Sequence, residues 1–249
     1  DQKSYRVDLA DRSPVWRNHR VINLNKHPYD LTRVRNKLSF DLFRDLPHFG
    51  SLRTVFTRLF IDDVDYGLFT QIEQPNPAFL AAHGLDSEGN LYKARFFEFY
   101  RYSDVLRSRS DANYDENLFE TLLEIRGSRN HEKLLAMLDD VNDERLSIQA
   151  VIRKYFHRSN YLTWLAGSIL LGNLDTQNQN FLLYSPSASS AWYFLPWDYD
   201  GAWGFFEQPD QAAAAARPRW EEGVANWWPS VLHQRFLREA GNVAELSAR

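Results

Sequence analysis

The interpretation of this chain depends most on the stretch Gly172-Asn173-Leu174-Asp175-Thr176-Gln177-Asn178-Gln179-Asn180, which follows a long apolar segment and precedes a predicted β-hairpin. All of these residues except Gly172 and Leu174 can form hydrogen bonds through their side chains. Polar groups packed beside buried elements must be satisfied by backbone, ligand or metal. Taken alone, the stretch fits two interpretations equally well. It is either a ligand or metal site, or a structural loop whose Asn and Asp side chains cap the preceding helix and brace turns.

A second polar cluster lies at the far end of the same predicted hairpin: Pro196-Trp197-Asp198-Tyr199-Asp200-Gly201-Ala202-Trp203-Gly204. The hairpin joins two short apolar runs, residues 181–184 and 192–195, through a Ser-rich turn. Because a hairpin returns the chain to its starting end, we expect Asp198 beside Asn180 and near Asp175. Carboxylates and an amide carbonyl are ligands that suit Mg²⁺. Zinc is disfavoured because no cysteine and no close pair of histidines joins the group.

The segments around the two clusters predict an α+β fold with two lobes. After residue 103 helical spacing dominates, and helices are expected at residues 116–125, 131–138, 144–156, 161–171 and 229–240. Before residue 103, a hairpin is expected at residues 54–73 and a strand at 91–102. The sequence thus divides into a small strand-containing lobe, residues 1–103, and a mainly helical lobe, residues 104–249.

One amphipathic helix is predicted in the first lobe between Asp30 and Leu46, with Asp30 as its N-cap. Its apolar residues recur every three or four positions, so we expect them to face the core: Leu31, Val34, Leu38, Leu42 and Leu46.

Composition excludes several classes of function. The 249 residues are 44% hydrophobic and 25% charged, as in ordinary globular proteins. The formal net charge of −4 gives no reason to expect a nucleic-acid partner. With no cysteine, the chain has no disulfide and no thiolate metal site or nucleophile. Its longest apolar runs fall well short of the roughly 20 residues that cross a bilayer, so no membrane span is expected.

The order of the two clusters is similar to that of protein kinases. In those enzymes an Asp orients the substrate hydroxyl, and an Asn and a second Asp hold Mg²⁺ against the nucleotide phosphates. The step from Asp175 to Asn180 matches this order. The usual His-Arg pair before the first Asp is replaced by Asn173-Leu174, and Asp198-Tyr199-Asp200-Gly201 stands in place of Asp-Phe-Gly.

Over nearly its whole length the sequence resembles the CotH-type kinases, a family named for a bacterial spore-coat protein. The segments that carry the resemblance are Lys3-Ser4-Tyr5-Arg6, Asp30-Leu31-Thr32-Arg33-Val34-Arg35-Asn36, Tyr66-Gly67-Leu68-Phe69, Glu73-Gln74, Gly89-Asn90-Leu91-Tyr92-Lys93, Gly172-Asn173-Leu174-Asp175 and Pro196-Trp197-Asp198-Tyr199-Asp200-Gly201. The resemblance implies a divergent two-lobed protein-kinase-like fold without an ordinary Gly-rich loop.

Carried over to this sequence, the resemblance makes Asp175 the catalytic residue and Asn180 and Asp198 the Mg²⁺ ligands. Asp200 becomes either a second metal ligand or a bracing carboxylate. Lys3, on the first strand, is the first choice for the lysine that contacts the nucleotide phosphates, and Lys93 and Arg35 are its competitors. If Lys3 has this role, part of the nucleotide site is expected upstream of residue 1.

Two further residues have open alternatives. Glu73 either contributes to the nucleotide site, by pairing with the phosphate lysine or lying at the hinge, or is a strand-end glutamate in solvent. Arg35 either contacts phosphate or is a structural Arg at the lobe interface. The seven histidines are scattered and are all interpreted as surface or structural residues.

The leading functional hypothesis is an ATP- and Mg²⁺-dependent phosphotransferase, with Mn²⁺ as an alternative ion, that acts on Ser or Thr of a protein substrate. The resemblance favours an extracytoplasmic, cell-surface or secreted location. One alternative is a catalytically silent adhesin or scaffold domain of the same fold. Another is a glycosidase, which needs two carboxyl groups about 5 to 9.5 Å apart. Asp198 and Asp200 are a poor pair for it, because alternate residues of an extended segment point to opposite sides.

Overall fold

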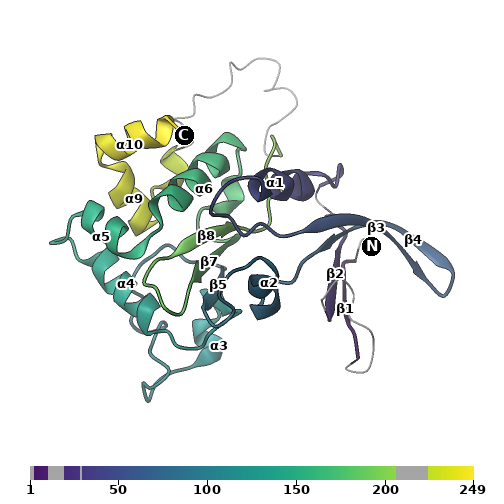
Figure 1. The fold of residues 1–249 in the computed structure, drawn as a ribbon, viewed down its shortest axis with the longest axis horizontal. Helices are drawn as coiled ribbons and strands as arrows, with labels where there is room; N and C mark the ends of the chain where they lie inside the picture. The colour runs from purple at the N-terminus through teal and green to yellow at the C-terminus, as the bar shows by residue number, and fades with distance from the viewer. Residues whose placement is uncertain (1–2, 11–19, 29, 206–223) are drawn as a thin grey trace.

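The computed structural model describes residues 3–10, 20–28, 30–205 and 224–249. It contains two four-stranded antiparallel sheets and a set of helices, which confirms the α+β class (Figure 1). Helices α4, α5, α6, α9 and α10 lie on one side of the second sheet, and the first sheet lies at the opposite end of the molecule (Figure 1).

The first sheet has the strand order β1-β2-β4-β3. Its strands are β1 (Tyr5–Asp8), β2 (Val21–Asn25), β3 (Thr54–Ile61) and β4 (Val64–Ile72). The predicted hairpin at 54–73 is confirmed. Its turn is made by Asp62 and Asp63, which both have positive φ, the left-handed backbone that two-residue hairpin turns require.

The second sheet has the strand order β6-β5-β7-β8. Its strands are β5 (Asn90–Ala94), β6 (Leu123–Ile125), β7 (Phe181–Ser185) and β8 (Tyr193–Pro196). β7 is buried on both faces: Phe181 and Leu183 join the core against the helices, and Leu182 and Tyr184 join a second core toward α1 and α2. This double burial explains why β7 is apolar at successive positions rather than alternating.

The α-helices are α1 (Arg35–Arg44), α2 (Pro77–Ala82), α3 (Glu116–Phe119), α4 (Glu132–Asn142), α5 (Ile148–Tyr155), α6 (Arg158–Leu170), α9 (Val231–Leu237) and α10 (Ala240–Ser247). Two short 3₁₀ helices are η1 (Leu174–Thr176) and η2 (Ala225–Trp227). None of the helices within the described ranges has the length and apolar character that a bilayer crossing requires.

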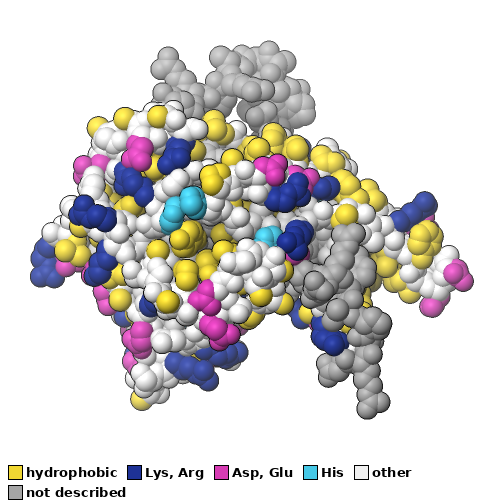
Figure 2. Space-filling view, viewed as in Figure 1, with side chains coloured by type: hydrophobic (Ala, Val, Ile, Leu, Met, Phe, Trp, Pro, Cys, Tyr) yellow, Lys and Arg dark blue, Asp and Glu magenta, His cyan; other side chains and the backbone are white. Residues whose placement is uncertain are grey.

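Helix α1 differs from its prediction in both its start and its buried face. It begins at Arg35, because Arg33 has positive φ (58°) and interrupts helical geometry. The buried positions are Asn36, Ser39, Phe40 and Phe43. Four of the five residues predicted to face the core are instead exposed: Leu31, Val34, Leu38 and Leu42. Leu46 is partly buried against the cluster around Phe43. Figure 2 shows hydrophobic side chains on the surface over the position of this helix.

The strand predicted at 91–102 ends at Ala94. The backbone N–H of Phe97 donates to the carbonyl of Asn178, and Phe99 and Tyr102 have positive φ, which a strand cannot accommodate. Phe97 and Phe99 are fully buried, so their apolar character serves the core and not a strand face.

Two predicted helices are also corrected. In the segment 116–125 only α3 is helical, and residues 123–125 form β6, which pairs with β5. The helix predicted at 229–240 is α9, which ends at Leu237, and a separate helix, α10, begins at Ala240 after the extended backbone of Glu239 (ψ 111°). β5 precedes residue 103 but pairs with β7, so one strand ahead of the predicted lobe boundary belongs to the second sheet.

Candidate functional site

The β7–β8 hairpin brings the two polar clusters of the sequence to the same edge of the second sheet. The strands pair with Phe181 opposite Pro196, so Asn180 precedes one strand where Trp197 follows the other. The predicted hairpin and its return of the chain are confirmed. The loop 172–180 precedes β7 and the segment 197–204 follows β8. The two therefore lie beside each other at this edge of the sheet.

Asp175 lies in η1, and its carboxylate is held by two side chains of its own loop. Asn180 donates from Nδ2 to Oδ2 at 2.6 Å, and Gln179 donates from Nε2 to Oδ1 at 2.6 Å. Burial, followed by the negative charge of Asp200, raises the pKa of Asp175 despite these hydrogen bonds. Because the amide nitrogen of Asn180 faces Asp175, its carbonyl oxygen remains as the atom that a cation would use.

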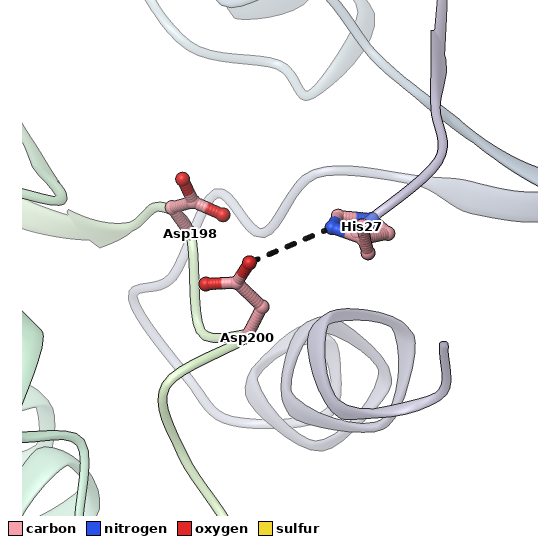
Figure 3. Close-up of side chains that lie close together, drawn as sticks. All are labelled: His27, Asp198 and Asp200. Atoms are coloured by element: carbon pink, nitrogen blue, oxygen red, sulfur yellow. Dashed lines mark ion pairs between the residues drawn. The ribbon is translucent and has the colours of Figure 1, made fainter. Parts of the chain in front are cut away.

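Asp198, Asp200 and His27 form a second cluster, in which one ligand atom of each residue lies within 4.8 Å of the others (Figure 3). His27 Nδ1 lies 3.8 Å from Asp200 Oδ2. Burial, followed by the charge of Asp200, raises the pKa of Asp198. Two carboxylates that repel each other at a partly buried position are stabilised by a cation.

Asn36 connects helix α1 to this cluster. Its Nδ2 donates to Asp198 Oδ1 at 3.0 Å, and its Oδ1 accepts from the backbone N–H of Tyr199 at 2.6 Å. Asn36 is 1% exposed and therefore acts as a buried brace that fixes the Asp198 side chain.

Three of the converging residues have the left-handed backbone that residues other than Gly seldom adopt: His27 (φ 46°), Asn180 (φ 56°) and Asp198 (φ 53°). Asn, Asp and His tolerate this geometry better than most residues. Each of them lies next to one end of a strand: His27 after β2, Asn180 before β7 and Asp198 after β8.

The donor atoms at this edge fit a divalent cation. Two carboxylates and the Asn180 carbonyl oxygen are hard ligands of the kind Mg²⁺ and Mn²⁺ take, and the imidazole of His27 adds one nitrogen. The charge interaction between Asp200 and Asp175 links this cluster to the Asp175 loop.

The sequence interpretation missed His27 and Asn36. The apolar run of β2, which ends two residues before His27, was a usable signal for a strand leading to it. His27 is 5% exposed and lies among acidic groups, so treating every histidine as surface or structural overlooked its position against the carboxylates.

The two candidate lysines lie in different surroundings. Lys3 is exposed and precedes β1 at the edge of the first sheet. Lys93 is half-buried on β5, with its Nζ 4.7 Å from the ring centroid of Trp197. Burial lowers the pKa of Lys93, against the raising effect of the charges of Glu124 and Asp198. Lys93 is thus the one of the two that interacts with a site carboxylate.

Glu73 is 2% exposed, so the alternative of a solvent-exposed strand-end glutamate is wrong. Its Oε2 accepts from the backbone N–H of Arg53 at 2.7 Å and lies 2.8 Å from His83 Nε2. Burial alone would raise the pKa of Glu73, but the hydrogen bonds from His83 and Arg53 outweigh it and lower the pKa.

Arg35 pairs with Asp30, with Nη1 2.6 Å from Oδ1. Asp30 also accepts the backbone N–H of Arg35 through Oδ2 at 3.1 Å, although the N-cap position itself is Val34. These contacts brace the turn that leads into α1, as a structural arginine does.

A family model described as CotH kinase protein matches residues 1–249. The chain belongs to the CotH family. Among curated proteins it is similar to the inner spore coat protein H of Bacillus subtilis (strain 168), with 27% identity over 217 residues. The match covers 82% of this chain and 55% of that CotH protein, so the chain spans about half the length of its relative.

Proposed function

We propose that this CotH-family chain is an ATP- and divalent-metal-dependent phosphotransferase, an atypical protein kinase that acts on Ser or Thr hydroxyls. The first sheet and α1 are assigned to the small lobe of a divergent protein-kinase-like fold, and the helices around the second sheet to the large lobe, with the boundary expected near residue 103. The family description, which includes the word kinase, supports this assignment.

The observation that carries the proposal is the arrangement around the β7–β8 hairpin. Asp175 and Asn180 are hydrogen-bonded to each other at one end of β7, and Asp198 and Asp200 follow the paired end of β8. An Asp, an Asn and a second Asp around a hairpin is the arrangement in which protein kinases hold substrate hydroxyl, metal and phosphates. Asp200, whose charge acts on both Asp175 and Asp198, has the position of an additional cation ligand.

When bound, Mg²⁺ or Mn²⁺ with ATP would supply the transferable phosphoryl group and the positive charge that offsets its oxygens. The chain's own contribution is positioning. Asp175 would accept a hydrogen bond from the acceptor hydroxyl and orient its oxygen, while Gln179 and Asn180 hold the carboxylate in place. Asn180 Oδ1, Asp198 and Asp200 would hold the cation, and Asn36 fixes the rotamer of Asp198.

Among the cationic candidates, Lys93 is supported as the phosphate contact by its interaction with Asp198. Lys3 is less well supported because it is exposed at the edge of the first sheet. Arg35 and Glu73 are assigned structural roles, in the turn before α1 and at the end of β4, because their observed partners are Asp30, Arg53 and His83.

The test is transfer of radiolabelled phosphate from ATP to a casein-like acceptor and to the chain itself, with Mg²⁺ and Mn²⁺ compared. Asp175→Asn should lower transfer by about 10²- to 10⁴-fold, the usual contribution of such a group, while nucleotide binding is kept. Asp62→Asn, in the hairpin turn of the first sheet, is the matched control and should transfer normally. Unchanged transfer in Asp175→Asn contradicts the assignment. Absence of both transfer and nucleotide binding in the unmodified chain supports the silent scaffold instead.

The spore-coat assignment of the relative supports an extracytoplasmic or surface location and a protein acceptor with Ser or Thr residues. Phosphorylation of surface proteins purified from the source cell would identify such acceptors.

A further inference from the structure

His27 is buried, and in the part of the chain that the structure describes one of its two ring nitrogens lacks the partner expected for a structural histidine. It is 5% exposed, and its Nε2 has no hydrogen-bond partner among the described residues. Its Nδ1 faces Asp200 Oδ2 at 3.8 Å (Figure 3). The same Nδ1 lies 3.4 Å from Asn36 Nδ2. A buried imidazole held mainly for packing would be expected to satisfy both nitrogens.

The contacts of Asn36 decide which form of His27 is present. The backbone N–H of Tyr199 can only donate, so the atom of Asn36 that faces it at 2.6 Å is the carbonyl oxygen. The amide nitrogen of Asn36 therefore faces His27 Nδ1 and can only donate to it. Nδ1 must then carry a lone pair, with the ring proton on Nε2. A lone pair directed at two carboxylates is the form in which imidazole binds a metal.

We propose that His27 Nδ1 is a ligand of the cation held by Asp198 and Asp200, and that it makes this site prefer Mn²⁺ to Mg²⁺. The inference rests on the phosphotransferase site proposed above and concerns the identity of its cation. Mg²⁺ is a hard ion that takes oxygen ligands and retains its waters, whereas Mn²⁺ takes the same carboxylates and, as a first-row transition-metal ion, also accepts an imidazole nitrogen beside them. The two-carboxylate, one-imidazole set within 4.8 Å is therefore better matched to Mn²⁺.

The competing explanation is an ion pair between a doubly protonated His27 and Asp200. A hydrogen on Nδ1 would lie against the hydrogens of Asn36 Nδ2, so the orientation of Asn36 disfavours that form. For Nδ1 of His27 to bind a metal ion, only its long 3.4 Å contact with Asn36 Nδ2 has to be broken.

The test uses the whole chain with Mn²⁺ alone, followed by electron paramagnetic resonance. Loss of the free Mn²⁺ signal gives the affinity, displacement by Mg²⁺ gives the selectivity, and pulsed measurements detect coupling of the bound Mn²⁺ to nitrogen. We expect a nitrogen coupling in the unmodified chain that changes when its histidines carry ¹⁵N. This readout needs no variant and no catalysis.

His27→Asn places an amide oxygen where Nδ1 lies and tolerates the left-handed backbone. We expect it to weaken Mn²⁺ binding by at least about tenfold, to remove the nitrogen coupling and to leave Mg²⁺ binding unchanged. His48→Asn is the matched control, because His48 also has positive φ (66°) but is exposed and packs on His157. It should bind Mn²⁺ as the unmodified chain does.

Three results overturn the inference: no binding of Mn²⁺ alone, bound Mn²⁺ without nitrogen coupling, or equal Mn²⁺ and Mg²⁺ selectivity in His27→Asn and the unmodified chain. Binding of an ATP analogue with Mg²⁺ is measured separately. A chain that shows the nitrogen coupling but neither binds nucleotide nor transfers phosphate would contradict the proposed kinase function and leave the metal site standing.

Discussion

The side-chain amide of Asn36, on the first helix, donates a 3.0 Å hydrogen bond to the carboxylate of Asp198, which follows the last strand of the second sheet. The same amide accepts from the backbone of Tyr199. One buried residue thus connects helix α1 to the segment after β8, which carries Asp198 and Asp200.

Asn36→Ala removes both hydrogen bonds and leaves a buried N–H and a buried carboxylate without their partner. We expect the free energy of unfolding to fall by about 1 to 3 kcal/mol, measured by urea denaturation. Lys37→Ala, at the next position of the same helix, removes a partly exposed pair with Asp41 and a 6.0 Å contact with the ring of Phe56, and should cost less than about 1 kcal/mol. Equal losses in the two variants would contradict a bracing role for Asn36.

Asp198→Asn should stabilise the metal-free protein. Because burial and Asp200 raise the pKa of Asp198, the folded state binds this proton more tightly than the unfolded chain does. The ionised carboxylate therefore lowers stability above its folded-state pKa, and this penalty disappears as the pH falls through that pKa. We expect Asp198→Asn to raise the urea midpoint at neutral pH, with the gain shrinking as the pH falls toward the ordinary Asp value of 3.8.

The same variant should lose the stabilisation that a divalent cation gives the unmodified chain, because binding to the folded state alone raises stability by mass action. Thermal unfolding with and without Mn²⁺ measures this. A metal-induced rise in melting temperature that is equal in both proteins would exclude Asp198 as a ligand.

Glu73→Gln should have the opposite pH dependence. The pKa of Glu73 is lowered because hydrogen bonds from His83 and Arg53 outweigh burial, so its charge stabilises the fold above the ordinary value of 4.5. That stability is lost as the pH falls through the folded-state pKa. We expect the variant to be less stable by about 1 to 3 kcal/mol at neutral pH, with the difference vanishing in acid. The exposed Glu88→Gln is the control, and a difference that does not depend on pH would refute the prediction.

Lys93→Met and Lys3→Met distinguish the two candidate phosphate lysines. Loss of a charge-assisted hydrogen bond to phosphate costs about 1.5 to 3 kcal/mol, or roughly ten- to hundredfold in affinity. We expect this loss in Lys93→Met and little change in Lys3→Met, as measured by calorimetry with Mg²⁺ and an ATP analogue. The reverse pattern would return the role to Lys3.

The sequence predicted the β3–β4 and β7–β8 hairpins because their apolar runs and turns are local signals. It also placed Asp175, Asn180, Asp198 and Asp200 at one edge, since this follows from the hairpin alone. The orientation of α1 could not be predicted by counting apolar residues. Its buried face carries Asn36 and Ser39, and Asn36 is turned inward because its polar partners Asp198 and Tyr199 lie there.

The role of His27 could not be predicted either, because it also depends on contacts with residues far away in the sequence. Its partners Asp198 and Asp200 lie in the last part of the chain, and a lone histidine after a short strand carries no periodic signal. Only the packing of the first sheet's β2 end and α1 against the segment after β8 brings these residues together.

The cation cluster draws its histidine from the first thirty residues and its aspartates from beyond β8. During translation, a nascent chain that has not yet emerged past Asp200 holds only the imidazole half. On the proposed assignment, the cation site is complete only once the segment after β8 has been synthesised, so we expect a truncation that ends before Asp198 to lack it.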